Sequence, residues 1–172
     1  MMRKGVLLVT IVFIFFGCKK EEVNEFPFDS LIVSSAGLHH DISVKFTNSD
    51  TVFLQRRFPK PTENFYAIIK NNEKIKLNKY LQSLNFKKFK SEYSQEHLCD
   101  GGSFLINISN NGKSKSILIY GGIAPNELYN FVDSLSTFKK NLKFSSTKQI
   151  IDFGDLGPIL LPPPPPLVKQ TE

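Results

Sequence analysis

Two short polar stretches bring together every histidine of the chain with other groups that can bind metal ions or transfer protons. The first is residues 39–41 (HHD) and the second is residues 97–100 (HLCD). Imidazole, thiolate and carboxylate groups together suit a borderline metal such as zinc. A cysteine whose thiol pKa is lowered by a nearby base would serve as a nucleophile. The candidates for this chemistry are His39, His40, His97 and Cys99.

The pattern around these four residues favours ordinary loop residues over a metal site. Adjacent His39 and His40 point in different directions on most backbones, and the sequence alone does not show that the two stretches meet. No flanking motif supports Cys99 as a nucleophile, and an isolated cysteine is more often a small buried hydrophobe. We therefore predict no metal and no cofactor. A metal-dependent or thiol enzyme that uses these residues is the alternative.

The size and composition of the chain fit one domain with short additions at its ends. It has 172 residues, 41% of them hydrophobic, and 16 are phenylalanine, which is enough apolar side chain for a core. The formal charge is +6, but no block of basic residues is dense enough to predict a nucleic-acid partner. The only cysteines are Cys18 and Cys99.

The amino-terminal residues have the three zones of a secretory signal. Arg3 and Lys4 are positive, residues 5–16 (GVLLVTIVFIFF) are apolar, and Gly17-Cys18 ends the run. An apolar run of about 12 residues is short for a membrane-spanning helix, which needs roughly 20, and it fits a signal peptide. We predict a signal peptide over residues 1–17. An uncleaved signal anchor and a buried core helix are the alternatives.

Phe15-Phe16-Gly17-Cys18 resembles the lipobox of bacterial lipoproteins, with Phe16 at a position where that family usually has a small residue. The resemblance implies that Cys18 is acylated and that the membrane is a partner through this lipid anchor. Residues 19–22 (KKEE) resemble the signal that exports Bacteroidetes lipoproteins to the cell surface. That resemblance implies an outer-membrane location with exposure at the surface, and a solvated tether is the alternative.

Periodicity indicates alternating groups of strands and helices. Strands are expected at residues 30–35, 42–46 and 51–57. Residues 65–70 fit a strand or a helix. An amphipathic helix capped by Asn71-Asn72 follows through Ile75, Leu77, Leu81 and Leu84. Residues 86–93 read as a linker or a short irregular strand, with Phe86 and Phe89 in the core.

The second half of the domain contains a hairpin and a helix. Asn111-Gly112 separates the apolar runs 104–108 and 116–120, and both residues tolerate the positive φ of a type I′ turn. After Pro125, a helix is expected from apolar residues at helical spacing. These are Leu128, Phe131, Val132, Leu135 and Phe138. The order predicts an α+β fold of the ββαββα kind, an antiparallel sheet with two helices on one face.

The predicted organisation has four parts: a signal peptide at 1–17, a lipid-anchored linker at 18–27, the α+β domain at 28–148, and an apolar strap with a proline-rich tail at 149–172. The segment 150–161 is expected to form a final strand or a strap on the domain. The proline run at 162–166 adopts polyproline II, as a stiff spacer or as a ligand for an aromatic groove.

The arrangement from Asp29 to Phe138 resembles a group of uncharacterised Bacteroidetes lipoprotein domains of unknown function. The shared features are the first strand (SLIVSSAG), the 42–54 hairpin, the 75–84 helix, Tyr93 with Asp100, the 104–120 hairpin and Pro125. Many of those domains have a cysteine-rich loop after the first strand, where this chain has AGLHH without cysteine. The resemblance implies a fold and a location but no activity.

Three tripeptides resemble the Asp-Ser/Thr-apolar acceptor of Bacteroidetes protein O-glycosylation. They begin at Asp29, Asp50 and Asp133. The third lies inside the expected helix, and only Thr51, beside a turn, is expected to be sterically open. Thr51 is therefore the O-glycosylation candidate.

From the sequence we therefore expect a membrane-anchored lipoprotein whose domain is non-enzymatic and binds a protein or glycan partner or associates with the envelope. A purely structural envelope role, in which the proline tail reaches another layer, is a third hypothesis.

Overall fold

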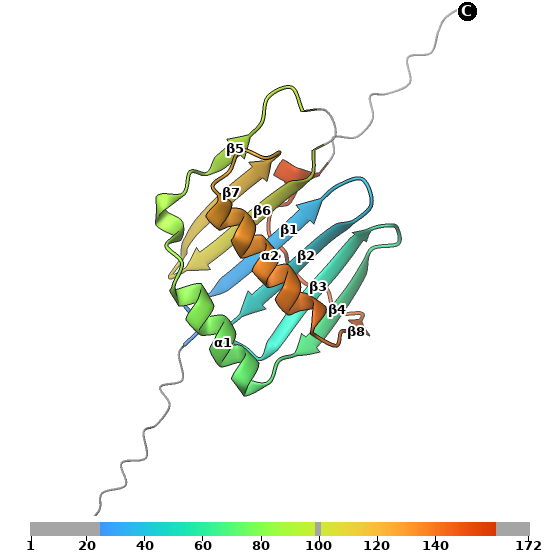
Figure 1. The fold of residues 1–172 in the computed structure, drawn as a ribbon. Helices are drawn as coiled ribbons and strands as arrows, with labels where there is room; N and C mark the ends of the chain where they lie inside the picture. Colours follow the sequence, from blue (N-terminus) through green and yellow to red (C-terminus); the bar gives the residue numbers. More distant parts are fainter. Residues whose placement is uncertain (1–24, 99–100, 161–172) are drawn as a thin grey trace, which may run out of the picture.

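The computed structural model describes residues 25–98 and 101–160, and in this part eight strands form one mixed sheet (Figure 1). The strand order is β5-β7-β6-β1-β2-β3-β4-β8. The strands are β1 Ser30–Ala36, β2 Asp41–Thr47, β3 Thr51–Phe58, β4 Glu63–Ile68, β5 Glu92–Ser94, β6 Ser103–Asn110, β7 Lys113–Tyr120 and β8 Ser145–Thr147. The helices are α1 Asn71–Gln82, α2 Asn126–Lys140 and the 3₁₀ turns η1 Phe86–Lys88 and η2 Gly157–Ile159.

Strand β1 lies inside the sheet, between a neighbour that is close in sequence and one that is far away. A short turn joins it to β2, in which Val44 pairs with Val33. On its other side Val33 pairs with Ile106 of β6. Leu31 is completely buried in β1, and Phe46 and Ile106 on the neighbouring strands are almost completely buried. The apolar residues of three strands therefore form one continuous surface.

The hairpin of β6 and β7 confirms the predicted Asn-Gly turn. Asn111 has a φ of 51° and Gly112 a φ of 72°, the left-handed values that a type I′ turn requires at both central positions. Pairing continues without a break from Asn110 opposite Lys113 to Ser103 opposite Tyr120.

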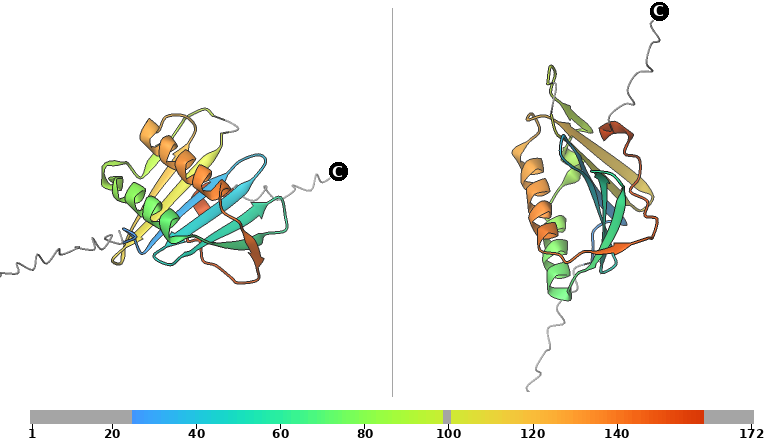
Figure 2. Two further views of the ribbon diagram at one scale, coloured as in Figure 1. Left: turned by 60° about the horizontal axis from the view of Figure 1, so that its bottom comes forward. Right: turned by 90° about the vertical axis from the view of Figure 1, so that its right-hand side faces the viewer.

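Both helices cover the same face of the sheet (Figure 2). Four of the five residues of α2 predicted to face the core are buried, with Leu128 completely inaccessible and Phe131 1% exposed, and Phe138 is partly buried. Phe86 and Phe89 are also buried, as predicted. The ring of Phe86 meets that of Phe131 edge to face, with the centroids 5.1 Å apart, an arrangement that aromatic pairs prefer.

The N-cap of helix α1 is one residue earlier than predicted. Lys70, and not Asn71-Asn72, is the N-cap, and the helix starts at Asn71. The carboxylate of Glu73 reaches back and accepts a hydrogen bond from the Lys70 N–H at 2.9 Å. This carboxylate satisfies a backbone donor that a capping asparagine would leave unpaired. The expected cap is therefore wrong, and the helix ends at Gln82, before Leu84.

The α+β class is confirmed, and the sheet is larger than the ββαββα order anticipates. Residues 63–68 form strand β4, which resolves the ambiguous stretch, and Glu92–Ser94 form the short strand β5. The prediction of a purely antiparallel sheet is wrong at one place, because β5 runs parallel to β7. After β5 the chain forms β6, and β7 then lies between them in the sheet. Strand β7 is parallel to β5 and antiparallel to β6.

The carboxy-terminal segment covers the face of the sheet opposite the helices (Figure 2). After β8, which pairs with β4, the chain crosses this face and ends in η2, which packs on β6. Phe153 is 3% exposed, and the Lys45 Nζ donates to the backbone oxygen of Asp152 at 2.8 Å. Ile32 and Leu105 are buried on the same face, because strand alternation turns them away from the helices. We call residues 148–160 the strap.

Among the described residues, no helix has both the length and the apolar character needed to cross a membrane.

We predict that the strap contributes to stability through Phe153. Replacing Phe153 with Ala should lower the free energy of unfolding by about 3 kcal/mol, as expected for deleting a buried aromatic ring. Ile150, in the same segment, is 94% exposed, so Ile150→Ala is the matched control and should cost under about 0.5 kcal/mol. Urea unfolding measures both, and equal losses in the two variants would contradict a packed strap.

Candidate functional site

The two histidine-containing stretches leave the sheet at the same end. Ala36, the last residue of β1, pairs with Ser103, the first residue of β6, so the loop after β1 and the loop before β6 start side by side. His39 and His40 are exposed in the first loop, and His97 is exposed in the second with a φ of 61°. Sequence reasoning could not place these loops together, and the pairing of β1 with β6 does so.

This closeness does not assemble a metal site from the described residues. Within residues 25–98 and 101–160, no group of three histidine, cysteine, aspartate or glutamate side chains is placed to hold a metal ion. Cys99 and Asp100 lie outside the described residues, as do Cys18 and the proline run at 162–166. The thiol chemistry considered for Cys99 therefore remains a hypothesis.

A cavity of about 190 Å³ lies at the same end of the sheet, under helix α2. Its floor comes from the helix-facing side of the three strands β1, β2 and β6, its wall from α2, and His40 stands at its edge. The floor residues are Val33, Ser35, Ile42, Val44, Phe46 and Phe104, and the wall residues are Val132, Asp133, Leu135, Ser136 and Lys139. Seven apolar and five polar residues line the cavity, so it combines hydrocarbon walls with groups that can orient a ligand.

The sequence places these residues through two periodicities. In β1 and β2, alternation points Val33, Ile42 and Val44 toward the helices. In α2, residues three or four apart lie on one face, so Val132, Leu135 and Lys139 follow one another along the cavity. Helix α2 crosses the strands obliquely from β7 toward β3 (Figure 1), which leaves the ends of β1 and β2 beside it incompletely covered.

Lys139 is the charged group that distinguishes this cavity. Its side chain is half-buried, and this burial lowers the pKa of the Lys139 ammonium, with a further lowering by the adjacent Lys140. In the described part of the chain, the Lys139 ammonium makes no hydrogen bond or ion pair. A partly desolvated ammonium without a counter-ion is unfavourable in the free protein and is suited to bind an anion.

A second polar cluster, on the strap side of the sheet, is structural. The hydroxyls of Ser34 and Ser43 are completely buried and lie 2.6 Å apart. The guanidinium of Arg57 donates to the Ser43 hydroxyl and to the backbone oxygen of Ser35. Burial lowers the pKa of Arg57 from its ordinary value, and Asp41 opposes this effect. These hydrogen bonds link β1, β2 and β3.

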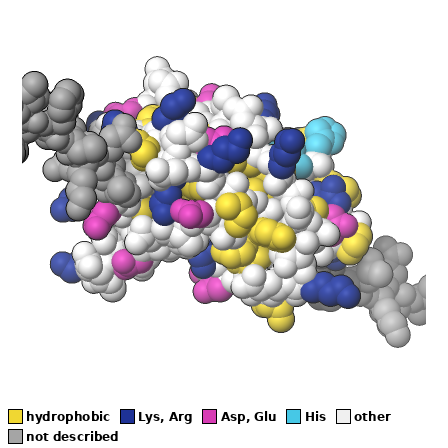
Figure 3. All heavy atoms as spheres, turned by 90° about the horizontal axis from the view of Figure 1, so that it is seen from below, with side chains coloured by type: hydrophobic (Ala, Val, Ile, Leu, Met, Phe, Trp, Pro, Cys, Tyr) yellow, Lys and Arg dark blue, Asp and Glu magenta, His cyan; other side chains and the backbone are white. Residues whose placement is uncertain are grey.

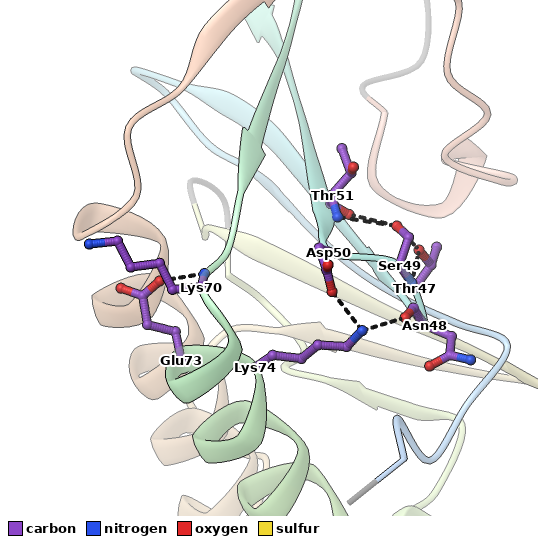
Figure 4. Close-up of polar contacts among 8 residues, drawn as sticks. All are labelled: Thr47, Asn48, Ser49, Asp50, Thr51, Lys70, Glu73 and Lys74. Carbon is purple, nitrogen blue, oxygen red and sulfur yellow. Dashed lines mark hydrogen bonds and ion pairs between the residues drawn. The ribbon is translucent and has the colours of Figure 1, made fainter. Parts of the chain in front are cut away.

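The glycosylation candidate Thr51 lies at the corner where the β2–β3 turn meets α1 (Figure 4). Thr51 is half-buried as the first residue of β3, and its N–H donates to the Ser49 hydroxyl at 3.2 Å. The Lys74 Nζ donates to Asp50 at 2.7 Å and to the backbone oxygen of Asn48 at 2.8 Å. Asp50, the aspartate of the acceptor tripeptide, is therefore held by Lys74 of α1. Modification of Thr51 remains a prediction.

Comparison with known families places the chain in one of them. The family described as "Domain of unknown function (DUF6438)" matches residues 40–139, more than half of the chain. The chain belongs to this family. The DUF6438 region begins at His40 and ends at Lys139, and both of these residues line the cavity. It contains the cavity wall and most of its floor, whereas Val33 and Ser35 of β1 come before it. No curated protein and no solved structure matches the chain.

Sequence reasoning identified one residue of this DUF6438 cavity, His40, and missed Lys139. A signal was present, because Lys139 follows Leu135 by four residues and Val132 by seven and so continues the buried face of the helix. His39, beside His40, does not line the cavity.

We predict that the charge of Lys139 costs stability. Because its pKa is lowered in the folded state, the penalty is fully present at neutral pH and disappears as the pH rises through that pKa to 10.5 and above. Lys139→Met keeps the apolar stem and should raise the free energy of unfolding slightly at pH 7, with a smaller gain at pH 11. Urea unfolding at both pH values measures it.

The exposed Lys140 provides the control for this measurement. Lys140→Met removes the same charge from the same helix turn and should change stability by less than about 0.5 kcal/mol. A Lys139→Met variant that is destabilised at pH 7, or a gain that grows with pH, would contradict a desolvated ammonium.

Proposed function

We propose that the protein is a lipoprotein, anchored through an acylated Cys18, whose DUF6438 domain is a non-enzymatic binding module outside the cytoplasm. The observation that carries this proposal is the sequence of residues 1–22. A positive start, an apolar run, Gly17-Cys18 and an immediate polar stretch agree with one another at every step.

The entry of the chain into the domain supports this arrangement. Glu25 follows Cys18 by about seven residues, so the domain would begin within about 25 Å of the anchored residue even if the chain were fully extended. Phe26 is buried, and the Gln82 side chain donates to the Glu25 backbone oxygen at 2.9 Å. The entry point is thus fixed against the end of α1.

Strand β1 then runs from this entry to the opposite end of the sheet (Figure 1). The loops with His39, His40 and His97 lie at that opposite end, and the cavity opens beside them. An anchor at Cys18 would therefore hold the entry end toward the membrane and present the cavity and the loops away from it.

The surface of the domain suits binding in an aqueous compartment. Seen from below, basic and acidic side chains are interspersed, while hydrophobic side chains gather in one area (Figure 3). Interspersed charges produce no strong field of one sign on this face. The partner that we propose for the exposed loop end is a protein or a glycan.

The test of the anchor is metabolic labelling with a palmitate analogue in a bacterial host. The wild-type chain and a Cys99→Ala variant should take up the label and remain with the membrane fraction. Cys18→Ala should take up none and lose membrane association, because acyl chains provide the anchoring energy. Since these are the only two cysteines, equal labelling of the two variants would refute lipidation at Cys18.

The residues after Cys18 predict the face of the membrane on which the domain lies. If residues 19–22 (KKEE) direct export to the surface, protease added to intact cells of the native host should digest the domain. Replacing Glu21 and Glu22 with Gln should protect it until lysis. Protection of the wild-type chain in intact cells would place the domain inside the outer membrane and reject the surface location.

A further inference from the structure

We propose that the cavity under α2 binds a short-chain carboxylate, with the carboxylate on Lys139 and the hydrocarbon chain against the sheet. This inference adds a small-molecule ligand in the cavity to the binding role proposed above. It rests on that role but not on the lipid anchor.

The apolar part of the cavity determines which hydrocarbon chain of a ligand fits. Val33, Val44 and Phe104 on the floor face Val132 and Leu135 on the helix, so a ligand's hydrocarbon would be bounded on both sides by hydrocarbon. A volume of about 190 Å³ is that of about six water molecules at the ~30 Å³ each occupies in the liquid. The cavity can therefore enclose a hydrocarbon chain of a few carbons.

The charge in the cavity determines the head group. Lys139 has no ion-pair partner in the described part of the chain, and burial already disfavours its charge. A carboxylate beside it would supply the missing counter-ion in a partly desolvated position, where charge-assisted hydrogen bonds are strongest. Ser136, one helical turn earlier on the same wall, provides a hydroxyl that can donate to the second carboxylate oxygen.

Asp133, the acidic residue of the cavity, does not remove the preference for an anionic head group at Lys139. Asp133 lies six residues before Lys139 on α2, which corresponds to about 9 Å along the helix axis. It is exposed, so water solvates its charge. The two charges thus mark different ends of the cavity, and the anionic head of a short ligand is favoured at the Lys139 end.

Binding of hexanoate to the full-length chain in phosphatidylcholine nanodiscs tests the proposal. Saturation-transfer NMR would compare hexanoate with hexanol, which has the same chain without the charge, and empty nanodiscs would give the background. We expect hexanoate to bind at least about tenfold more tightly than hexanol, because a hydrogen bond to a charged group contributes at least that much.

Three variants assign the effect to the cavity. Lys139→Met should weaken hexanoate about tenfold and leave hexanol unchanged, whereas Lys139→Arg should retain hexanoate binding. Lys140→Met is the matched control, because it removes the neighbouring exposed charge, and it should bind hexanoate as the wild type does. Circular dichroism of each variant would establish that it is folded.

Several results would overturn the proposal. Equal binding of hexanol and hexanoate, an equal loss in Lys140→Met, or no hexanoate binding by folded wild-type protein would each do so. Hexanoate binding that appears only after removal of residues 161–172 would mean that the chain's own carboxy-terminal segment competes with hexanoate for the cavity. None of these results affects palmitate labelling at Cys18, so failure of this inference is distinguishable from failure of the lipoprotein proposal.

Discussion

The pairing of β1 with β2 on one side and β6 on the other is the interaction on which the rest of the structure depends. Val33 pairs with Val44 nearby in sequence and with Ile106 more than seventy residues away. Without β1, the strands β2–β4 and the β6–β7 hairpin would be two small sheets, each too narrow to support both helices. With it, they form one apolar surface that α1 and α2 cover.

The same pairing also arranges the candidate residues. It brings the loops of His40 and His97 to one end of the sheet and places Val33 on the cavity floor. Helix α2 is long enough to pass from β7 to β3, and its last turns bring Lys139 over the ends of β1 and β2. The half-buried ammonium is kept at a cost in stability, which is typical of residues that serve binding.

Local patterns predicted the elements well and their assembly poorly. The Asn111-Gly112 turn and the buried face of α2 were predicted correctly, because turn chemistry and helical periodicity are local properties. The position of β6 beside β1 and the parallel pair β5–β7 were not predicted, because strand order depends on long-range packing that alternation does not encode. The Lys139 cavity was missed for the same reason, since a sequence does not show where a helix leaves a sheet uncovered.

Native-state hydrogen exchange of the full chain, followed by mass spectrometry, tests the central position of β1 most directly. Peptides from β1 and β6 should exchange as slowly as the most protected parts of the chain, and far more slowly than the three-residue edge strands β5 and β8. Exchange of β1 as fast as those edges, with β6 and β7 still protected, would show that the two hairpins do not share a sheet and would contradict this account.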